Sequence, residues 1–202
     1  MTKLSLSQVI ILLVIGIVFI SGCGNDRSSN HQEKSNIAKV TDIDLVSLTT
    51  FSNPKSVCGT LVYVPIYSST FHQAGDWEFL LTVTLSIHNI DLNQNIEVSA
   101  VSFFDTKGEP VGEFVSKPIT IKPLATRQFV IPETDKMGGT GANFLVKWES
   151  EKEVVKPIIE ALMISTSSGQ GISFTTQGTV IQKLQHSPNT SVNKQTTKEE
   201  EN

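Results

Sequence analysis

Residues 79–88, FLLTVTLSIH, place an apolar side chain at every odd position from 79 to 87 and a polar side chain at every even position from 82 onward. A repeat of two residues is the pattern of a β-strand that turns one face to a hydrophobic core and the other to water. We therefore predict a strand here, in a protein built from sheets.

The same repeat occurs on the carboxyl side of this strand. It returns in residues 96–104, in residues 142–149 and in residues 172–180, where Gly178 is expected to form a bulge. The sequence DTKG at residues 105–108 supplies a turn, with Asp105 bonded to its own backbone. These segments predict long strands joined by tight connections.

Shorter candidate strands lie at residues 61–68, 111–115, 119–122 and 127–131, and prolines push them toward sheet edges or strand ends. Residues 157–166 contain EALM, which favours helix, but the short length and the β-rich surroundings favour a strand. About seven to nine short strands with no helical crossover pattern predict an all-β, antiparallel sandwich.

The amino terminus has the organisation of an export signal. Residues 9–20 are apolar or glycine, Lys3 precedes them, and no acid occurs before Asp26. This run fits a signal-peptide core of about 7–15 residues and is shorter than the roughly 20 residues of a spanning helix. It ends in ISGC at residues 20–23, which resembles the lipobox of bacterial lipoproteins. We expect cleavage after residue 22 and lipidation of Cys23.

Lipidation at Cys23 implies several acyl chains, palmitate among them, and a membrane attachment on the outer, non-cytoplasmic side of the cell envelope. Gly24 follows the cysteine, which favours the outer membrane, facing the periplasm, if the cell has two membranes. The alternatives are an uncleaved amphiphilic anchor and an ordinary signal peptide with a chance cysteine.

The rest of the chain divides by composition into a lipidated cysteine and flexible tether (23–39), a β-sandwich domain (40–184) and a disordered acidic tail (185–202). Without residues 1–22 the chain keeps 15 of its 16 basic residues and all 20 acidic residues, so its formal charge is −5. Because nucleic-acid binding depends on clustered Lys and Arg, this charge argues against a nucleic-acid partner.

Several phrases within the domain stand together: YVPIYS from residue 63, TLSIHN from residue 84, GGTGANF from residue 138, EALM from residue 160 and GISF from residue 171. In this order they resemble a bacterial exported or lipoprotein domain family, the family of unknown function 3124. The resemblance covers roughly residues 59–180 and implies a known module with no assigned activity. The phrase IEVSAVSFFDTKGEPV also looks like the strand pairs of immunoglobulin-like domains, which supports an immunoglobulin-like sandwich.

Candidate chemistry is sparse. The glycine-rich residues 138–141 lead into a strand and lack a following GK[ST], so a structural turn is favoured over nucleotide binding. The four histidines (His31, His72, His88, His186) show no zinc spacing, and no GxSxG elbow accompanies the serines. We therefore expect no catalytic residue, no metal and no cofactor. Glu160, inside an apolar run, is expected to form a structural ion pair.

Cys58 is the cysteine left over once Cys23 is lipidated. An odd cysteine in an exported protein is a buried thiol, an intermolecular bridge or a reactive group, and the buried thiol is favoured. The sequence gives no acid or histidine beside it that would activate it.

Aromatic residues gather between residues 63 and 77, and aromatic rings are favoured at interface cores. The candidate binding surface consists of Tyr67, Phe71, Trp77 and Asn143. The leading hypothesis is a membrane-anchored, non-catalytic envelope module that binds an envelope protein or glycan, or assists assembly. A hydrolase or thiol-redox enzyme with an unrecognised site and a carrier of a small apolar ligand remain as alternatives.

Overall fold

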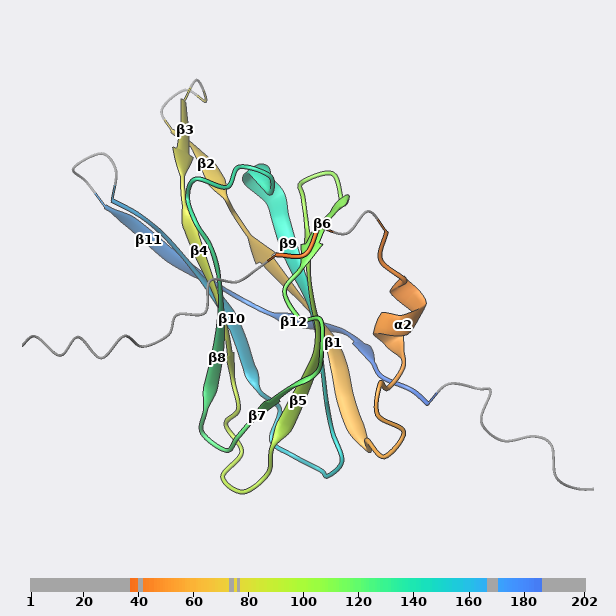
Figure 1. The fold of residues 1–202 in the computed structure, drawn as a ribbon. Helices are drawn as coiled ribbons and strands as arrows, with labels where there is room; N and C mark the ends of the chain where they lie inside the picture. The colour runs from red at the N-terminus through yellow and green to blue at the C-terminus, as the bar shows by residue number, and fades with distance from the viewer. Residues whose placement is uncertain (1–36, 40–41, 73–74, 76, 167–170, 187–202) are drawn as a thin grey trace, which may run out of the picture. The chain divides into compact units, whose positions relative to one another are not determined.

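The computed structural model describes residues 37–39, 42–72, 75, 77–166 and 171–186. Twelve strands form within these residues, and every paired strand is antiparallel to its neighbour (Figure 1). The elements are, in chain order, α2 (Leu45–Thr49), β1 (Cys58–Ile66), β2 (Ser69–His72), β3 (Trp77–Leu80), β4 (Thr82–His88), β5 (Ile96–Phe104), β6 (Pro110–Glu113), β7 (Ile119–Ile121), β8 (Thr126–Ile131), a 3-10 turn (Gly139–Gly141), β9 (Ala142–Ser150), β10 (Ile158–Ser165), β11 (Ile172–Gln177) and β12 (Thr179–Lys183).

Two sheets face each other. The six-stranded sheet has the order β12-β1-β9-β5-β6, with β7 also paired to β5, and the four-stranded sheet has the order β11-β10-β4-β8. The predicted all-β sandwich is confirmed. The strand count exceeds the expected seven to nine because β2, β3, β6 and β7 are only three or four residues long.

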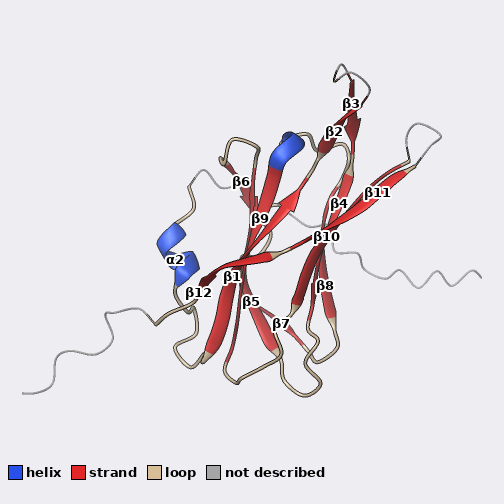
Figure 2. Cartoon of the chain, turned by 180° about the vertical axis from the view of Figure 1, so that it is seen from behind, coloured by secondary structure: helices blue, strands red, loops and turns tan. Residues whose placement is uncertain are grey.

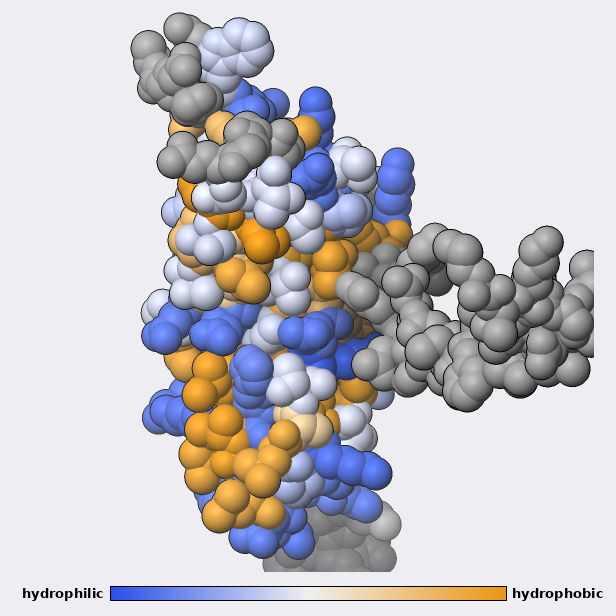
Figure 3. All heavy atoms as spheres, turned by 90° about the vertical axis from the view of Figure 1, so that its left-hand side faces the viewer, coloured by the Kyte–Doolittle hydropathy of each residue, from blue (hydrophilic) through white to orange (hydrophobic). Residues whose placement is uncertain are grey.

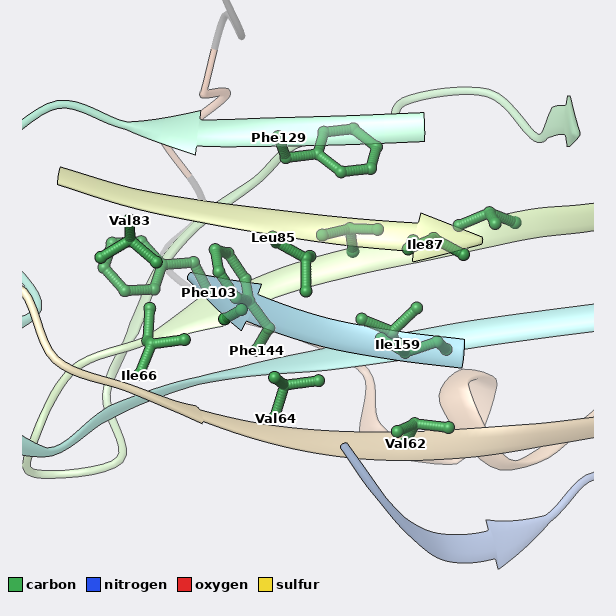
Figure 4. Packing of buried hydrophobic residues seen from close by; sticks show 14 of the residues in the cluster. Val62, Val64, Ile66, Val83, Leu85, Ile87, Phe103, Phe129, Phe144 and Ile159 are labelled. Carbon is green, nitrogen blue, oxygen red and sulfur yellow. The ribbon is translucent and has the colours of Figure 1, made fainter. Parts of the chain in front are cut away.

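The core lies between the sheets and follows the parity that the sequence predicts. Val83, Leu85 and Ile87 of β4 are fully buried and meet the inward side chains of β1 and β9 (Figure 4). Phe103 and Phe144, on the neighbouring strands β5 and β9, pack with ring centroids 5.5 Å apart. Burial of large apolar side chains at roughly 25 cal/mol per Å² is the main favourable contribution to folding.

Two predicted strands are divided between sheets. The chain breaks at Leu81, whose N–H donates to the Ser68 carbonyl, so β3 pairs with β2 in a separate hairpin and β4 enters the four-stranded sheet. This hairpin projects beyond the two sheets (Figures 1 and 2). The second break is at Gly178, where the chain passes from β11 in the four-stranded sheet to β12 in the six-stranded sheet.

A short segment before β1 covers the outer face of the six-stranded sheet (Figure 2). Asp44 caps the amino end of its helix α2, and the Asp44 carboxylate accepts a hydrogen bond from the Val46 N–H at 2.9 Å. Leu48 of α2 packs on Leu61 and Ala100 of the sheet. Sequence periodicity did not predict this helix, because five residues are too few for a 3.6-residue repeat to emerge.

The turn that the sequence predicts at residues 105–108 is present in the structure. Asp105 Oδ1 accepts hydrogen bonds from the N–H groups of Lys107 and Glu109, both at 2.8 Å, as predicted for the turn. Residues 158–165 are a strand, as expected. No helix within the described ranges is long and apolar enough to cross a membrane.

The outer face of the four-stranded sheet is partly apolar. Ile158, Leu162 and Ile164 of β10 are 39–46 % exposed there. Figure 3, which views the side of the molecule that carries this sheet, shows apolar patches broken up by hydrophilic side chains.

Candidate functional site

A cleft of about 550 Å³ opens where the start of β1, the β9–β10 connection and the end of β12 meet. We call it the edge cleft, and it lies within the size range of small-molecule sites. It is lined by Phe51, Val57, Cys58, Gly59, Thr60, Trp148, Glu153, Val154, Lys156, Lys183, Leu184, Gln185 and His186.

Backbone pairing brings these distant segments together. The N–H of Leu184 donates to the Gly59 carbonyl at 3.1 Å, and the N–H of Phe51 donates to the Gln185 carbonyl at 3.0 Å. The rings of Phe51 and His186 then pack with their centroids 4.7 Å apart and their planes tilted by 45°. A side chain at position 59 would not fit, because a Cβ there would lie 2.6 Å from the Trp148 carbonyl oxygen. The cleft is therefore defined by pairing between both ends of the described chain.

One row of side chains crosses three strands inside the cleft. Thr60 of β1 pairs with Trp148 of β9 on one side and with Lys183 of β12 on the other. Directly paired residues project from the same face of a sheet, with Cβ atoms about 5 Å apart. Thr60 has the inward parity that Val62 and Val64 use in the core. The row therefore places a buried aromatic ring, a buried hydroxyl group and an exposed lysine side by side.

The Thr60 hydroxyl is the polar group that calls for explanation. Thr60 is 5 % exposed, and its Oγ1 has no hydrogen-bond partner within the described residues. Buried hydroxyl groups in folded proteins are almost always bonded, since an unmade bond costs about 1–3 kcal/mol. Thr60 lines the cleft, but its Oγ1 is itself buried, so a ligand would have to displace the atoms that cover this oxygen in order to bond it.

The Cys58 thiol also lies in the cleft wall, and it is in a form that reacts slowly. Burial raises the pKa of the Cys58 thiol, and the negative charge of Glu153 raises it further, whereas a backbone hydrogen bond at Val154 opposes the shift. The Sγ donates to the Lys152 carbonyl at 3.2 Å. The thiolate is the nucleophilic form, so a raised pKa leaves Cys58 a poor nucleophile near neutral pH.

The residues chosen from the sequence as a binding surface are spread over several environments. Tyr67 is half-buried and packs edge-on against Phe174 at 5.7 Å, and Asn143 is half-buried in β9. Phe71 and Trp77 are 61 % and 68 % exposed on the β2–β3 hairpin. Phe71 pairs with Glu78, so Trp77, one residue earlier in β3, lies on the opposite face of the hairpin. The two exposed rings are not on one common face.

The other candidates have structural partners. His88 Nδ1 lies 2.8 Å from Thr126 Oγ1, and His88 Nε2 lies 3.7 Å from Glu160 Oε1, which makes His88 the ion-pair partner of Glu160 when the imidazole is protonated. In the glycine-rich turn, the Thr106 hydroxyl donates to the Gly138 carbonyl and accepts from the Gly141 N–H. Cys23, the tether up to residue 36 and His31 lie outside the described residues, so their roles stay predictions.

Sequence reasoning missed the edge cleft and a buried charged pair. Lys147 and Glu149 occupy the outer parity of β9, where alternation predicts exposure, yet they are 4 % and 0 % exposed under residues 47–53. Lys147 Nζ donates to the Ser47 carbonyl and to Ser52 Oγ, and the Glu149 carboxylate accepts from the Ser52 N–H at 3.0 Å. Leu145, an apolar side chain on the same outer face of β9, was the available signal that this face is covered.

The fold and the cleft define a class, an all-β antiparallel sandwich with a small-molecule-sized opening at its edge. Within that class, the family model described as Protein of unknown function (DUF3124) matches residues 59–181, and the chain belongs to this family. The suspected resemblance is thereby confirmed. The matched region contains Gly59, Thr60 and Trp148 of the cleft.

Comparison with known proteins adds little beyond the family. No curated protein matches the sequence. A solved structure named "Crystal Structure of Thermotoga maritima 1070" has a TM-score of 0.38 and 12% sequence identity, over 60% of this chain and 93% of that chain. Across the described residues, no group of three or more His, Cys, Asp or Glu side chains is arranged to hold a metal ion.

Proposed function

We propose that this protein is a lipid-anchored binding module of the bacterial cell envelope and that it holds a small, partly apolar molecule in the edge cleft. The anchor is the lipid on Cys23, attached on the outer side of the membrane. The observation that carries the binding role is the buried Thr60 hydroxyl, which has no hydrogen-bond partner among the described residues and belongs to a residue that lines a cleft of about 550 Å³.

The cleft has the composition of a small-molecule site. Its apolar lining residues include Phe51, Val57 and Val154, of which Val57 is 55 % exposed, and a few polar groups lie beside them. Such sites combine apolar walls, which supply affinity, with a few fixed polar groups, which orient the ligand. Thr60, near the start of β1, is paired on both sides, so its side chain is held by a rigid element.

The state of Cys58 favours binding over thiol chemistry. Reactive cysteines have a lowered pKa in an electropositive setting, whereas burial and the nearby Glu153 raise the pKa of this thiol. Cys58 therefore contributes to the wall of the cleft in the proposed function and takes no part in a redox or acyl-transfer step.

Cys58 also provides a direct test, because the mature chain with Cys23→Ser retains it as the single cysteine. The experiment measures the rate at which iodoacetamide alkylates Cys58, with and without decanoate, decanol or decyltrimethylammonium below their micelle concentrations. At least one of these three ligands should slow the alkylation in a saturable manner.

The matched control moves the thiol away from the cleft. A chain with Cys58→Ser and Ser116→Cys places it on the exposed β6–β7 connection, and its alkylation should not respond to any of the three ligands. Equal protection at both positions, or no protection of Cys58 by any of the three, would refute ligand binding in the edge cleft.

A second candidate is docking of an envelope protein or glycan on the β2–β3 hairpin, which is favoured by the exposure of Phe71 and Trp77. A photo-crosslinking residue at position 77 should then give a discrete adduct in intact cells. The same residue at position 107, in the exposed β5–β6 turn, serves as the control. The same products from both positions, or none from position 77, would reject this surface.

A further inference from the structure

We infer that the ligand class of the edge cleft is an anionic amphiphile, a molecule with one negatively charged head and an apolar body. This inference rests on the proposed function, because it names the chemistry of the molecule that the cleft binds. It is carried by the row Lys183–Thr60–Trp148 and by the free charges at the rim of the cleft.

The residues that line the cleft have a net positive charge, whereas the chain as a whole has a net negative charge. The whole chain has a formal charge of −4, whereas the cleft is lined by Lys156 and Lys183 against the single acid Glu153. Within the described residues neither lysine has a carboxylate partner at ion-pair distance. Two lysines that have no ion-pair partner among the described residues therefore line the cleft, one from β12 and one from the β9–β10 connection.

Thr60 and Lys183 are neighbours on one face of the sheet, so an anionic head that reaches the buried Thr60 Oγ1 can also accept from the Lys183 ammonium. The two residues pair directly, so their side chains leave the sheet from adjacent positions on the same face. A hydroxyl without a partner can donate one hydrogen bond, and an ammonium can donate three. A carboxylate, sulfate or phosphate head accepts from both groups, and charge-assisted bonds of this kind are stronger than neutral ones.

The apolar body of the ligand has a separate place in the cleft. Trp148 pairs with Thr60 on the side away from Lys183, and Val154 follows in the β9–β10 connection. A head at Lys183 and Thr60 therefore leaves the apolar side chains that line the rest of the cleft for the body of the ligand. An uncharged amphiphile satisfies the hydroxyl but leaves the ammonium groups without a partner, and a cationic one is repelled by both lysines.

The experiment compares three ligands that share a ten-carbon chain and differ in the head: decanoate, decanol and decyltrimethylammonium, all below their micelle concentrations. Protection of Cys58 from alkylation gives an apparent affinity for each. Because exposed charges are screened by water, we expect decanoate to bind about five- to tenfold more tightly than decanol, with the cation weakest. Added salt should weaken decanoate binding and leave decanol binding unchanged.

Lysine variants then identify the residues that are responsible for the preference for decanoate. Lys183→Gln and Lys156→Gln should each reduce the preference for decanoate over decanol, whereas Lys107→Gln in the β5–β6 turn should leave it intact. Circular dichroism and the melting temperature verify that each variant is folded. Equal affinity for decanoate and decanol, a preference for the cation, or a preference that survives both substitutions would overturn the inference while ligand binding itself stands. If none of the three ligands protects Cys58, the proposed function fails as well.

Discussion

At the scale of single residues, some charged side chains of the six-stranded sheet are buried at positions where the alternating pattern of the sequence predicts exposure. Glu97 of β5 pairs directly with Glu149 of β9, and Lys147 is two residues away from Glu149 on the same face. Burial lowers the pKa of Lys147, while Glu149 opposes that shift. The segment before β1 is fastened to the sheet through these buried charges, because its Ser52 and Asn53 N–H groups bond the Glu149 carboxylate.

Glu97→Gln should stabilise the protein at neutral pH. Partial burial raises the pKa of the Glu97 carboxyl, and the charges of Glu149 and Glu151 raise it further. The neutral form is therefore favoured in the folded state, so its stabilising contribution is present below the ordinary pKa of 4.5 and is lost as the pH rises through the folded-state pKa. Like charges directly opposite in a sheet cost about 0.5–1 kcal/mol, which is the expected gain at neutral pH.

Chemical denaturation of the variant and the parent across acidic to neutral pH measures this effect. The difference between them should be near zero below pH 4.5 and should grow as the pH rises. Glu78→Gln, at an exposed position of the β2–β3 hairpin, is the control and should leave the unfolding free energy unchanged. A gain that is independent of pH would contradict the electrostatic explanation.

Thr60→Val should stabilise the unliganded protein and weaken ligand binding. Valine has nearly the same shape as threonine, so the substitution removes a buried hydroxyl without opening a cavity. Since Oγ1 has no partner within the described residues, about 1 kcal/mol of unfolding free energy is gained. The Cys58 alkylation assay should show lower affinity for decanoate in the same variant. Lower stability together with unchanged affinity would mean that the hydroxyl is bonded within the protein.

At the scale of elements, the sequence predicts strands well and their partners poorly. The alternation in β4, β5 and β9 is a local property, and the structure has those strands with the predicted inward residues. The divided strands were not predicted, because a break such as that at Leu81 depends on a hydrogen bond from a distant segment. The edge cleft was not predicted for the same reason, as its residues run from Phe51 to His186.

Gly178 shows how one position allows a strand to change sheets. Its N–H donates to the Ile159 carbonyl at 2.8 Å, and a Cβ at this position would lie 2.6 Å from Val62 Cγ1 and 3.0 Å from the Ile159 carbonyl oxygen. The sequence marked Gly178 as a bulge. The structure gives it a larger part, because β11 and β12 separate here and only a residue without a side chain fits between the two sheets.

Gly178→Ala should therefore destabilise the fold by about 2 kcal/mol, as expected for overpacking in a close-packed interior. The change is measured as a lower denaturant midpoint with an unchanged slope. Gly171→Ala is a suitable control, because a Cβ there meets only the Ser165 carbonyl oxygen at an ordinary 3.6 Å. Equal effects of the two substitutions would show that the close approach of Val62 and Ile159 does not restrict position 178 to glycine.

At the scale of the whole molecule, attachment and binding are expected to belong to different parts of the chain. The lipid is predicted on Cys23, outside the described residues, whereas the core, the buried charged pair and the edge cleft are formed by residues from 43 onward. Their strand pairing and core packing are contacts among the described residues. Folding and ligand binding should therefore not depend on the lipid. The lipid should determine only where in the cell the protein is found.

Cys23→Ser tests this separation. Without the thiol no acyl chain can be attached, and stable membrane binding requires two or more such chains. After export, the variant should be found in the soluble fraction of the envelope, with the same melting temperature as the detergent-extracted parent and with Cys58 still protected by its ligand. Ser21→Ala, which keeps a small residue before the cysteine, is the control and should remain in the membrane fraction. Recovery of exported Cys23→Ser in the membrane fraction would show that attachment does not use Cys23, and an unfolded soluble form would show that the lipid supports the fold.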